Sequence, residues 1–152
     1  MENQIKIAHQ DGDIVLPLKK GGYFYEDRGF GISIEAEAAS EEDWEKHPNC
    51  ASLASFGHPV TNPLAVGQVF GAKGGMGYDC DATPNAGAYF GFHAEQVSIS
   101  WRIISIEGDR ITVELEAFTE DVDYYDDRAK PQPISGVFSL QRCEPSELWV
   151  PY

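Results

Sequence analysis

The stretch VSISWRIISIEGDRITVELEA, residues 97–117, decides the fold class. Apolar and polar residues alternate over 97–103 and again over 111–117, which is the two-residue period of a half-buried β-strand. Residues 107–110, just before the second run, form a tight turn around Gly108, because glycine readily takes a positive φ. We therefore expect a β-hairpin of segments 97–106 and 111–118. Outward-facing Glu114 and Glu116 place one of its faces in water, as in an antiparallel sheet.

The alternation changes phase inside this stretch. Apolar residues up to Ile103 have odd numbers, whereas Ile104 and Ile106 have even ones. A phase change of this kind predicts either a β-bulge or a strand that leaves one sheet for another. The second alternative favours a sandwich over a barrel.

A second clear strand covers residues 30–37, where Phe30, Ile32, Ile34 and Ala36 face the core. Weaker strands are expected at Gln4–Ala8, Asp13–Leu18, Gly22–Glu26, Ala65–Gly71, Ala86–His93 and Ile134–Arg142. Glycine and proline turn signals separate these segments, and helix and strand do not alternate as they do in a βαβ fold.

Helix is expected only in an insertion near residues 39–56. Ser40 is a suitable N-cap for acidic residues that follow it, and Pro48 limits the helix to about two turns. A second short turn is expected from Asn49 to Phe56. We therefore predict that residues 1–152 form a single, mostly β domain, an antiparallel sandwich or open barrel with one or two short helices.

The composition excludes several classes of partner. The chain has 25 acidic and 11 basic residues and a net charge of -14, which repels nucleic acid and anionic membrane surfaces and attracts basic proteins. The first residues lack a basic start and an apolar run, and no segment has about 18 consecutive apolar residues. Three widely spaced cysteines favour reduced thiols. These features predict a cytoplasmic protein.

The densest charge lies in the acidic run 120–127, directly after the predicted hairpin. Its aspartates would steer a basic partner towards the protein, and its adjacent tyrosines would supply rigid contact area. The alternative is a solvated loop that only keeps the protein soluble. The predicted partner-binding residues are Asp121, Asp123, Tyr124, Tyr125, Asp126 and Asp127.

Other motifs match known chemistry poorly. Neither Asp121, Asp123 and Asp126 nor Asp79, Asp81 and Asn85 follow the twelve-residue calcium-loop pattern. The glycine-rich run 71–77 lacks the Gly-Lys-Ser/Thr sequence that a phosphate loop requires. The group His47-Pro48-Asn49-Cys50 is the best Cys–His candidate for nucleophilic catalysis, and no zinc-ligand pair has the usual spacing. We therefore expect no cofactor, metal or catalytic residue.

Two functions remain open. The first is a non-enzymatic binding protein that docks onto a basic protein; in size and charge the chain is similar to bacterial immunity proteins that neutralise toxins, although no motif carries this similarity. The second is a small-ligand or carbohydrate-binding or carbohydrate-processing β-domain, with residues 72–85 as a lid over a pocket. Exposed aromatic residues that would stack on sugars are Trp44, Tyr78, Tyr89 and Trp149.

Overall fold

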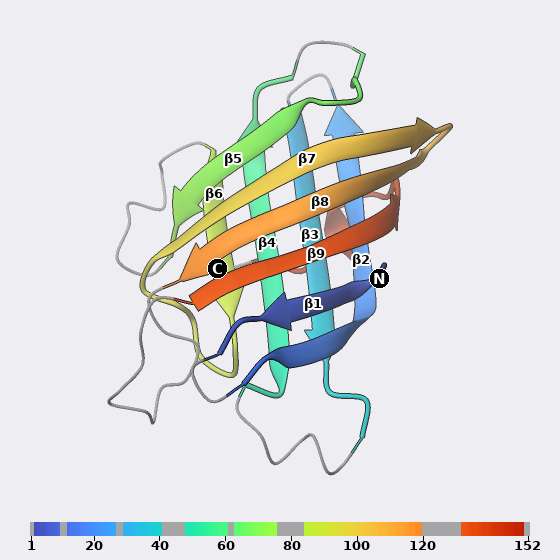
Figure 1. Cartoon of the computed structure of the whole chain (residues 1–152). Coiled ribbons are helices and arrows are strands. Elements are labelled where there is room, and N and C mark those ends of the chain that lie inside the picture. Colours follow the sequence, from blue (N-terminus) through green and yellow to red (C-terminus); the bar gives the residue numbers. More distant parts are fainter. Residues whose placement is uncertain are drawn as a thin grey trace.

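Nine β-strands form a closed barrel (Figure 1). The computed structural model describes residues 2–9, 12–26, 29–40, 48–60, 63–75, 84–119 and 132–150. The strands are β1 (Gln4–Ile7), β2 (Ile14–Glu26), β3 (Gly29–Glu37), β4 (Cys50–His58), β5 (Val69–Gly74), β6 (Asn85–Tyr89), β7 (Val97–Glu107), β8 (Arg110–Thr119) and β9 (Gln132–Gln141). A short 3₁₀ turn, η1 (Pro145–Glu147), follows β9.

The strand order around the barrel is β1-β2-β3-β4-β6-β5-β7-β8-β9. Every neighbouring pair is antiparallel except β5 and β6, which pair in parallel through Lys73 and Gly74. The barrel closes where β1 pairs with β9, at Lys6 with Ser135 and Ile7 with Ile134 (Figure 1). This closure joins segments more than 120 residues apart, and it leaves β1 without a free edge.

The all-β prediction is confirmed, but the sandwich is wrong. The phase change at Ile103 and Ile104 is a β-bulge within a single ladder, because β8 pairs with β7 on both sides of it. Further register shifts lie in the β2–β3 and β3–β4 ladders. Bulges bend strands and increase their twist, so these shifts curve one sheet until its edges meet.

The hairpin and the strand at 30–37 are confirmed. The hairpin is β7 and β8, joined by a turn in which Gly108 has a φ of 61°. β3 buries Phe30, Ile32 and Ile34 completely. Expected strands 13–18 and 22–26 are instead one continuous strand, β2, in which Gly21 and Gly22 serve close packing rather than a turn. A Cβ at Gly21 would lie 3.1 Å from side-chain atoms of Ile34 and Leu140.

The predicted helical turn from Asn49 to Phe56 is wrong, because these residues belong largely to strand β4. The other predicted helix begins after Ser40, and residues 41–47 lie outside the described residues. β4 alternates like its neighbours, with Leu53 and Ser55 facing inward opposite Ile34 and Ile32. The outward Ser52 and Ala54 are also buried, so the sequence shows little alternation of polarity there.

Large side chains fill the barrel interior. Trp101 lies among them with no exposed surface, and its strand neighbours Ile99 and Ile103 point the same way. The largest fully buried side chains are Trp101, Phe30, Phe138, Ile5, Ile7, Leu16, Ile32, Ile34, Leu53, Ile99, Ile103 and Ile111. This interior is a packed core of the kind that gives a small barrel its stability.

Two glycines of the 71–77 run, Gly74 and Gly75, have a packing role. A Cβ at Gly74 would lie 1.8 Å from the carbonyl oxygen of Ala86, across the parallel ladder between β5 and β6. Gly75 has a φ of 112°, and a Cβ there would lie 2.4 Å from the carbonyl oxygen of Glu95. The close approach of β5 to β6 therefore requires glycine at position 74, and the positive φ and the nearby Glu95 carbonyl require it at position 75.

We expect Gly74→Ala to lower the free energy of unfolding by about 2 kcal/mol, because backbone atoms must move to admit the methyl group. Gly71 is the matched control in the same strand, since a Cβ there would meet its nearest heavy atom at 3.9 Å. Urea unfolding of both variants measures the difference. Equal losses of stability for Gly71→Ala and Gly74→Ala would contradict the close approach of β5 and β6.

Candidate functional site

One end of the barrel gathers the longest acidic connections. At this end β3 stops at Glu37, which pairs with Cys50 of β4, and β8 stops at Thr119, which pairs with Gln132 of β9. The intervening segments 41–47 and 120–131 lie outside the described residues. Their sequences together hold nine acidic and three basic side chains. We call this end of the barrel, defined by Glu37, Cys50, Thr119 and Gln132, the acidic rim.

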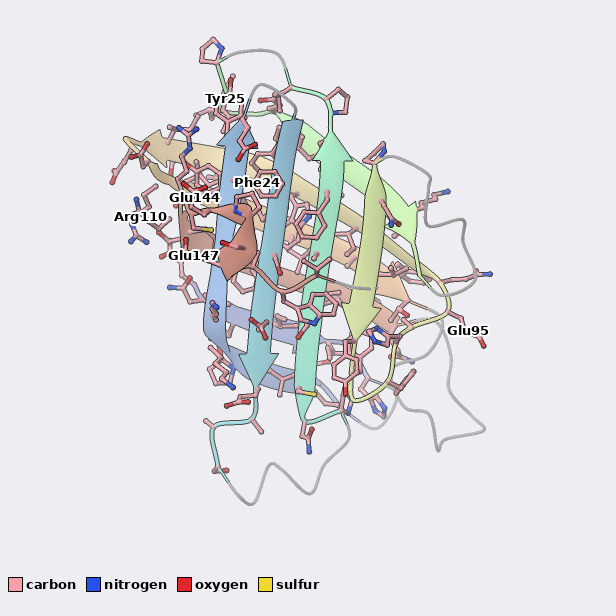
Figure 2. The ribbon with its side chains drawn as sticks, turned by 180° about the vertical axis from the view of Figure 1, so that it is seen from behind. Phe24, Tyr25, Glu95, Arg110, Glu144 and Glu147 are labelled. Carbon is pink, nitrogen blue, oxygen red and sulfur yellow. The ribbon has the colours of Figure 1, made fainter. Side chains whose placement is uncertain are left out.

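The rim is firmly anchored where the acidic run 120–127 is attached. Thr119 and Gln132 are both buried, and the Thr119 hydroxyl donates a hydrogen bond to the carbonyl oxygen of Gln96 at 3.0 Å. This bond ties the end of β8 to the connection between β6 and β7. Glu95 lies in that connection and points away from the barrel (Figure 2). A binding segment held at both ends by a rigid scaffold is a common arrangement in recognition proteins.

An exposed aromatic residue lies beside the acidic run. Phe118 is 47% exposed and occupies the outer face of β8, between Ser98 of β7 and Pro133 of β9. Glu116 lies on the same face, two residues earlier on the strand. A large aromatic side chain next to carboxylates is typical of an anchor residue with a charged surround.

The predicted partner-binding residues, Asp121, Asp123, Tyr124, Tyr125, Asp126 and Asp127, lie outside the described residues. The structure therefore places their attachment points and not their side chains. Phe118 was not predicted as a binding residue. Its parity would have identified it, because it follows Thr112, Glu114 and Glu116 on the face that meets water.

The remaining candidates show no chemistry within the described part of the chain. Asp79, Asp81, His47 and Cys80 lie outside it, and Asn85 begins β6 opposite Phe56. Across the seven described ranges, no three His, Cys, Asp or Glu side chains are grouped so that they would hold a metal ion. Cys50 and Cys143 are free thiols, and burial is the main cause that raises the pKa of each.

A polar cluster lies inside the barrel, between two residues of β4, Ser55 and His58, and Trp101 of β7. Trp101 Nε1 donates to Ser55 Oγ at 2.9 Å, and His58 Nε2 lies 2.7 Å from the same oxygen. A serine hydroxyl has two lone pairs and one proton, so Ser55 satisfies both groups when Nε2 is unprotonated. Burial lowers the pKa of His58 to about 4, which keeps the ring neutral at pH 7.

The Ser55–His58 spacing is that of a nucleophile and its base, but the site is closed. Ser55 is 0% and His58 2% exposed, and the rings of Phe30 and Phe70 lie 6.1 and 5.4 Å from the His58 ring. A substrate would have to enter the packed interior to reach the hydroxyl. We assign the cluster to packing: it satisfies the buried polar groups of two strands, β4 and β7.

A groove of about 480 Å³ lies on the outer wall of the barrel, between β1–β2 and β8–β9. Val15 and Val137 supply its apolar lining, and Lys6, Glu114 and Glu116 supply charge. Lys6 is paired with Asp13 at 3.4 Å, and Glu114 with Arg102 at 2.7 Å. None of the described residues of the predicted lid at 72–85 lines this groove, and the first of them, up to Gly74, are strand.

Comparisons of this chain with family models, curated proteins and solved structures found no match. Within the described residues no helix is long and apolar enough to cross a membrane.

Proposed function

We propose that the protein is a non-enzymatic binding protein that uses its acidic rim to dock onto a basic protein. The observation that carries this proposal is the fixed attachment of the acidic run 120–127 between Thr119 and Gln132, beside exposed Phe118. Segment 41–47 is attached at the same end, between β3 and β4. Concentrated negative charge speeds the association of a basic partner, and aromatic contacts then slow its release.

An immunity protein that blocks a basic bacterial toxin in the cytoplasm is the most concrete form of this proposal. Such a role requires a folded scaffold and a charged surface, and it requires no cofactor. The alternative of a small-ligand or carbohydrate-binding or carbohydrate-processing domain remains a prediction from the sequence, because residues 76–83 of its lid lie outside the described residues.

Removing the negative charges of the acidic run at the rim is expected to weaken binding of the basic partner at least tenfold at low salt. The clustered charge that steers the partner towards the protein is then lost. The rim variant changes Asp121, Asp123, Asp126 and Asp127 to asparagine. A matched control removes four charges near the opposite end of the barrel, by Glu2→Gln, Glu26→Gln, Glu107→Gln and Asp109→Asn. The partner is captured from lysate of the native organism and purified, and its affinity is measured by calorimetry at 50 and 300 mM NaCl.

The control variant is expected to bind within about threefold of the wild type and to keep its dependence on salt. Phe118→Ala is expected to raise the dissociation rate and leave the association rate unchanged. Equal affinities of the rim variant and the wild type would refute the proposal. Equal weakening by the rim and control variants would show that net charge, rather than the rim, is recognised.

A further inference from the structure

His58 lies at an end of the barrel where its own strand is held on one side. β4 runs from one end of the barrel to the other, so its last residue, His58, lies at the end opposite the acidic rim (Figure 1). The ladder between β4 and β6 stops at Phe56, which pairs with Asn85. Among the described strands, only β3 pairs with β4 beyond that point. A strand end that one ladder holds opens at a lower free-energy cost than a segment held by two.

The backbone at this end of β4 departs from regular strand geometry. Gly57 has a φ of 78°, which glycine adopts without strain. The register between β3 and β4 also shifts between the pair of Phe30 with His58 and the pair of Ile32 with Ser55. A change of conformation at Gly57 can therefore move His58 while the regular ladder, which begins at Ser55, stays in place.

The ring of His58 packs against two aromatic rings of the core. Phe30 and Phe70 stack with their centroids 4.2 Å apart, and the His58 ring lies 6.1 and 5.4 Å from them. All three side chains are buried. Movement of the His58 ring away from this cluster would therefore bring water to both phenyl rings.

The hydrogen bonds around Ser55 fit a neutral His58. Because Trp101 Nε1 donates to Ser55 Oγ, the hydroxyl keeps its own proton to donate to His58 Nε2. A proton on Nε2 would make Ser55 accept from two N–H groups, and the hydroxyl proton would lose its acceptor. The positive charge would also be buried among aromatic rings, which is costly. Protonation therefore favours a conformation in which the imidazole reaches water.

In the described part of the chain, no charged side chain faces His58 to offset a proton there. The neighbouring elements present aromatic residues to it, Phe30 from β3, Phe70 from β5 and Trp101 from β7. Tyr23 of β2 stacks on Phe30, and burial is the main cause that raises the pKa of this tyrosine, so it is also neutral. The described charged residues of β3, β5 and β7 alternate with the inward positions or are exposed: Glu35, Glu37, Lys73, Arg102 and Glu107.

We propose that the Ser55–His58–Trp101 cluster is a pH-sensitive switch: protonation of His58 moves its side chain into water and opens this end of the barrel, while the other strands stay paired. Opening exposes Phe30 and Phe70. The ladders from β7 to β8 and from β8 to β9 run along the whole of these strands and do not involve His58.

The direction of the switch follows from proton binding. In the open conformation His58 takes up a proton near pH 6.5, as a histidine in water does, whereas burial lowers its pKa to about 4 in the closed one. The open conformation therefore binds more protons between these values, and its population relative to the closed one rises as the pH falls. These two pKa values correspond to a rise of about twentyfold between pH 7 and pH 5.

The test is amide hydrogen exchange of the full chain at pH 7 and pH 5, measured by NMR and corrected for the intrinsic effect of pH. We expect the protection of residues 30 and 56–58 to fall at least tenfold at pH 5, whereas residues 111–117 keep theirs. His58→Gln carries no charge at either pH and should keep its protection at both. His93→Gln, which changes an exposed histidine, should behave as the wild type.

Three outcomes would overturn the proposal. An equal fall in His58→Gln would show that other groups open this end, and an equal fall at residues 111–117 would show that the whole barrel unfolds. If His58→Gln does not fold, the ring resonances of His58 in the wild type still decide. Protonation of this ring without faster exchange at residues 30 and 56–58 would refute the switch. The test uses no partner and does not involve the acidic rim, so its result is independent of the proposed function.

Discussion

Replacing Trp101 with alanine is expected to lower the free energy of unfolding by about 4–5 kcal/mol. Trp101 is fully buried in the barrel interior and pairs with Phe70 of β5 on one side and Leu115 of β8 on the other. Removing a buried indole costs about 3–5 kcal/mol through lost transfer energy and the cavity that remains. Ser55 also loses the hydrogen bond from Nε1. Because whole domains are stable by about 5–15 kcal/mol, this change brings the protein close to unfolding.

Two further variants separate the causes of this loss. Trp101→Phe keeps a buried ring and removes the indole N–H, so we expect a loss of about 1–2 kcal/mol. Ser100→Ala changes the neighbouring residue, which is only partly buried on the outer face, and should stay within about 0.5 kcal/mol of the wild type. Urea unfolding at constant pH measures all three. A loss below about 2 kcal/mol for Trp101→Ala would contradict a closely packed interior at this position.

The sequence predicted the strands whose outer faces meet water. In β7 and β8, serine, threonine and glutamate alternate with inward isoleucine, valine and leucine, so the period of two is visible. The bulge at Ile104 is visible for the same reason, because it moves a large apolar residue to the exposed side. A strand can be predicted from the sequence when one of its faces carries polar residues and the other carries apolar residues.

Strand β4, on the opposite side of the barrel, was hidden because most of its residues on both faces are buried. In β4 the outward Ala54 is as buried as the inward Leu53. Small residues also have weak strand propensity, so the sequence of β4 favoured a helical turn. The sequence also does not show that Leu148, after β9, packs against Gly22 on the outer face of β2.

Barrel closure and the arrangement of the rim are long-range properties. The pairing of Ile7 with Ile134 and the hydrogen bond from Trp101 to Ser55 join distant segments, and no local pattern encodes them. The acidic run was found from composition alone, whereas its fixed attachment at Thr119 required the ladder between β8 and β9. The Ser55–His58 pair was missed because its members show no motif other than their proximity in the folded chain.

Acidification from pH 7.5 to 4 is expected to remove about 3 kcal/mol of stability through His58 alone. An unfolded histidine takes up a proton near pH 6.5, whereas burial lowers the pKa of His58 in the folded protein to about 4. Between these values the unfolded state binds more protons, so stability falls as the pH falls. The stabilisation is complete above about pH 6.5 and is lost towards pH 4. Denaturant unfolding across this range measures the slope.

His58→Gln is expected to remove this part of the slope, while its loss of ring contacts with Phe30 and Phe70 lowers stability at every pH. The carboxylates are the same in both proteins. The difference in unfolding free energy between the wild type and His58→Gln, followed across the pH range, therefore gives the contribution of His58. His93→Gln is the matched control, because the side chain of His93 is exposed, and it should keep the wild-type slope. If the free energy of unfolding depended on pH in the same way for the wild type and His58→Gln, His58 would be protonated as easily in the folded barrel as in water. That result would require solvent to reach His58 at the end of β4, and it would reopen the Ser55–His58 pair as a site that a substrate can reach.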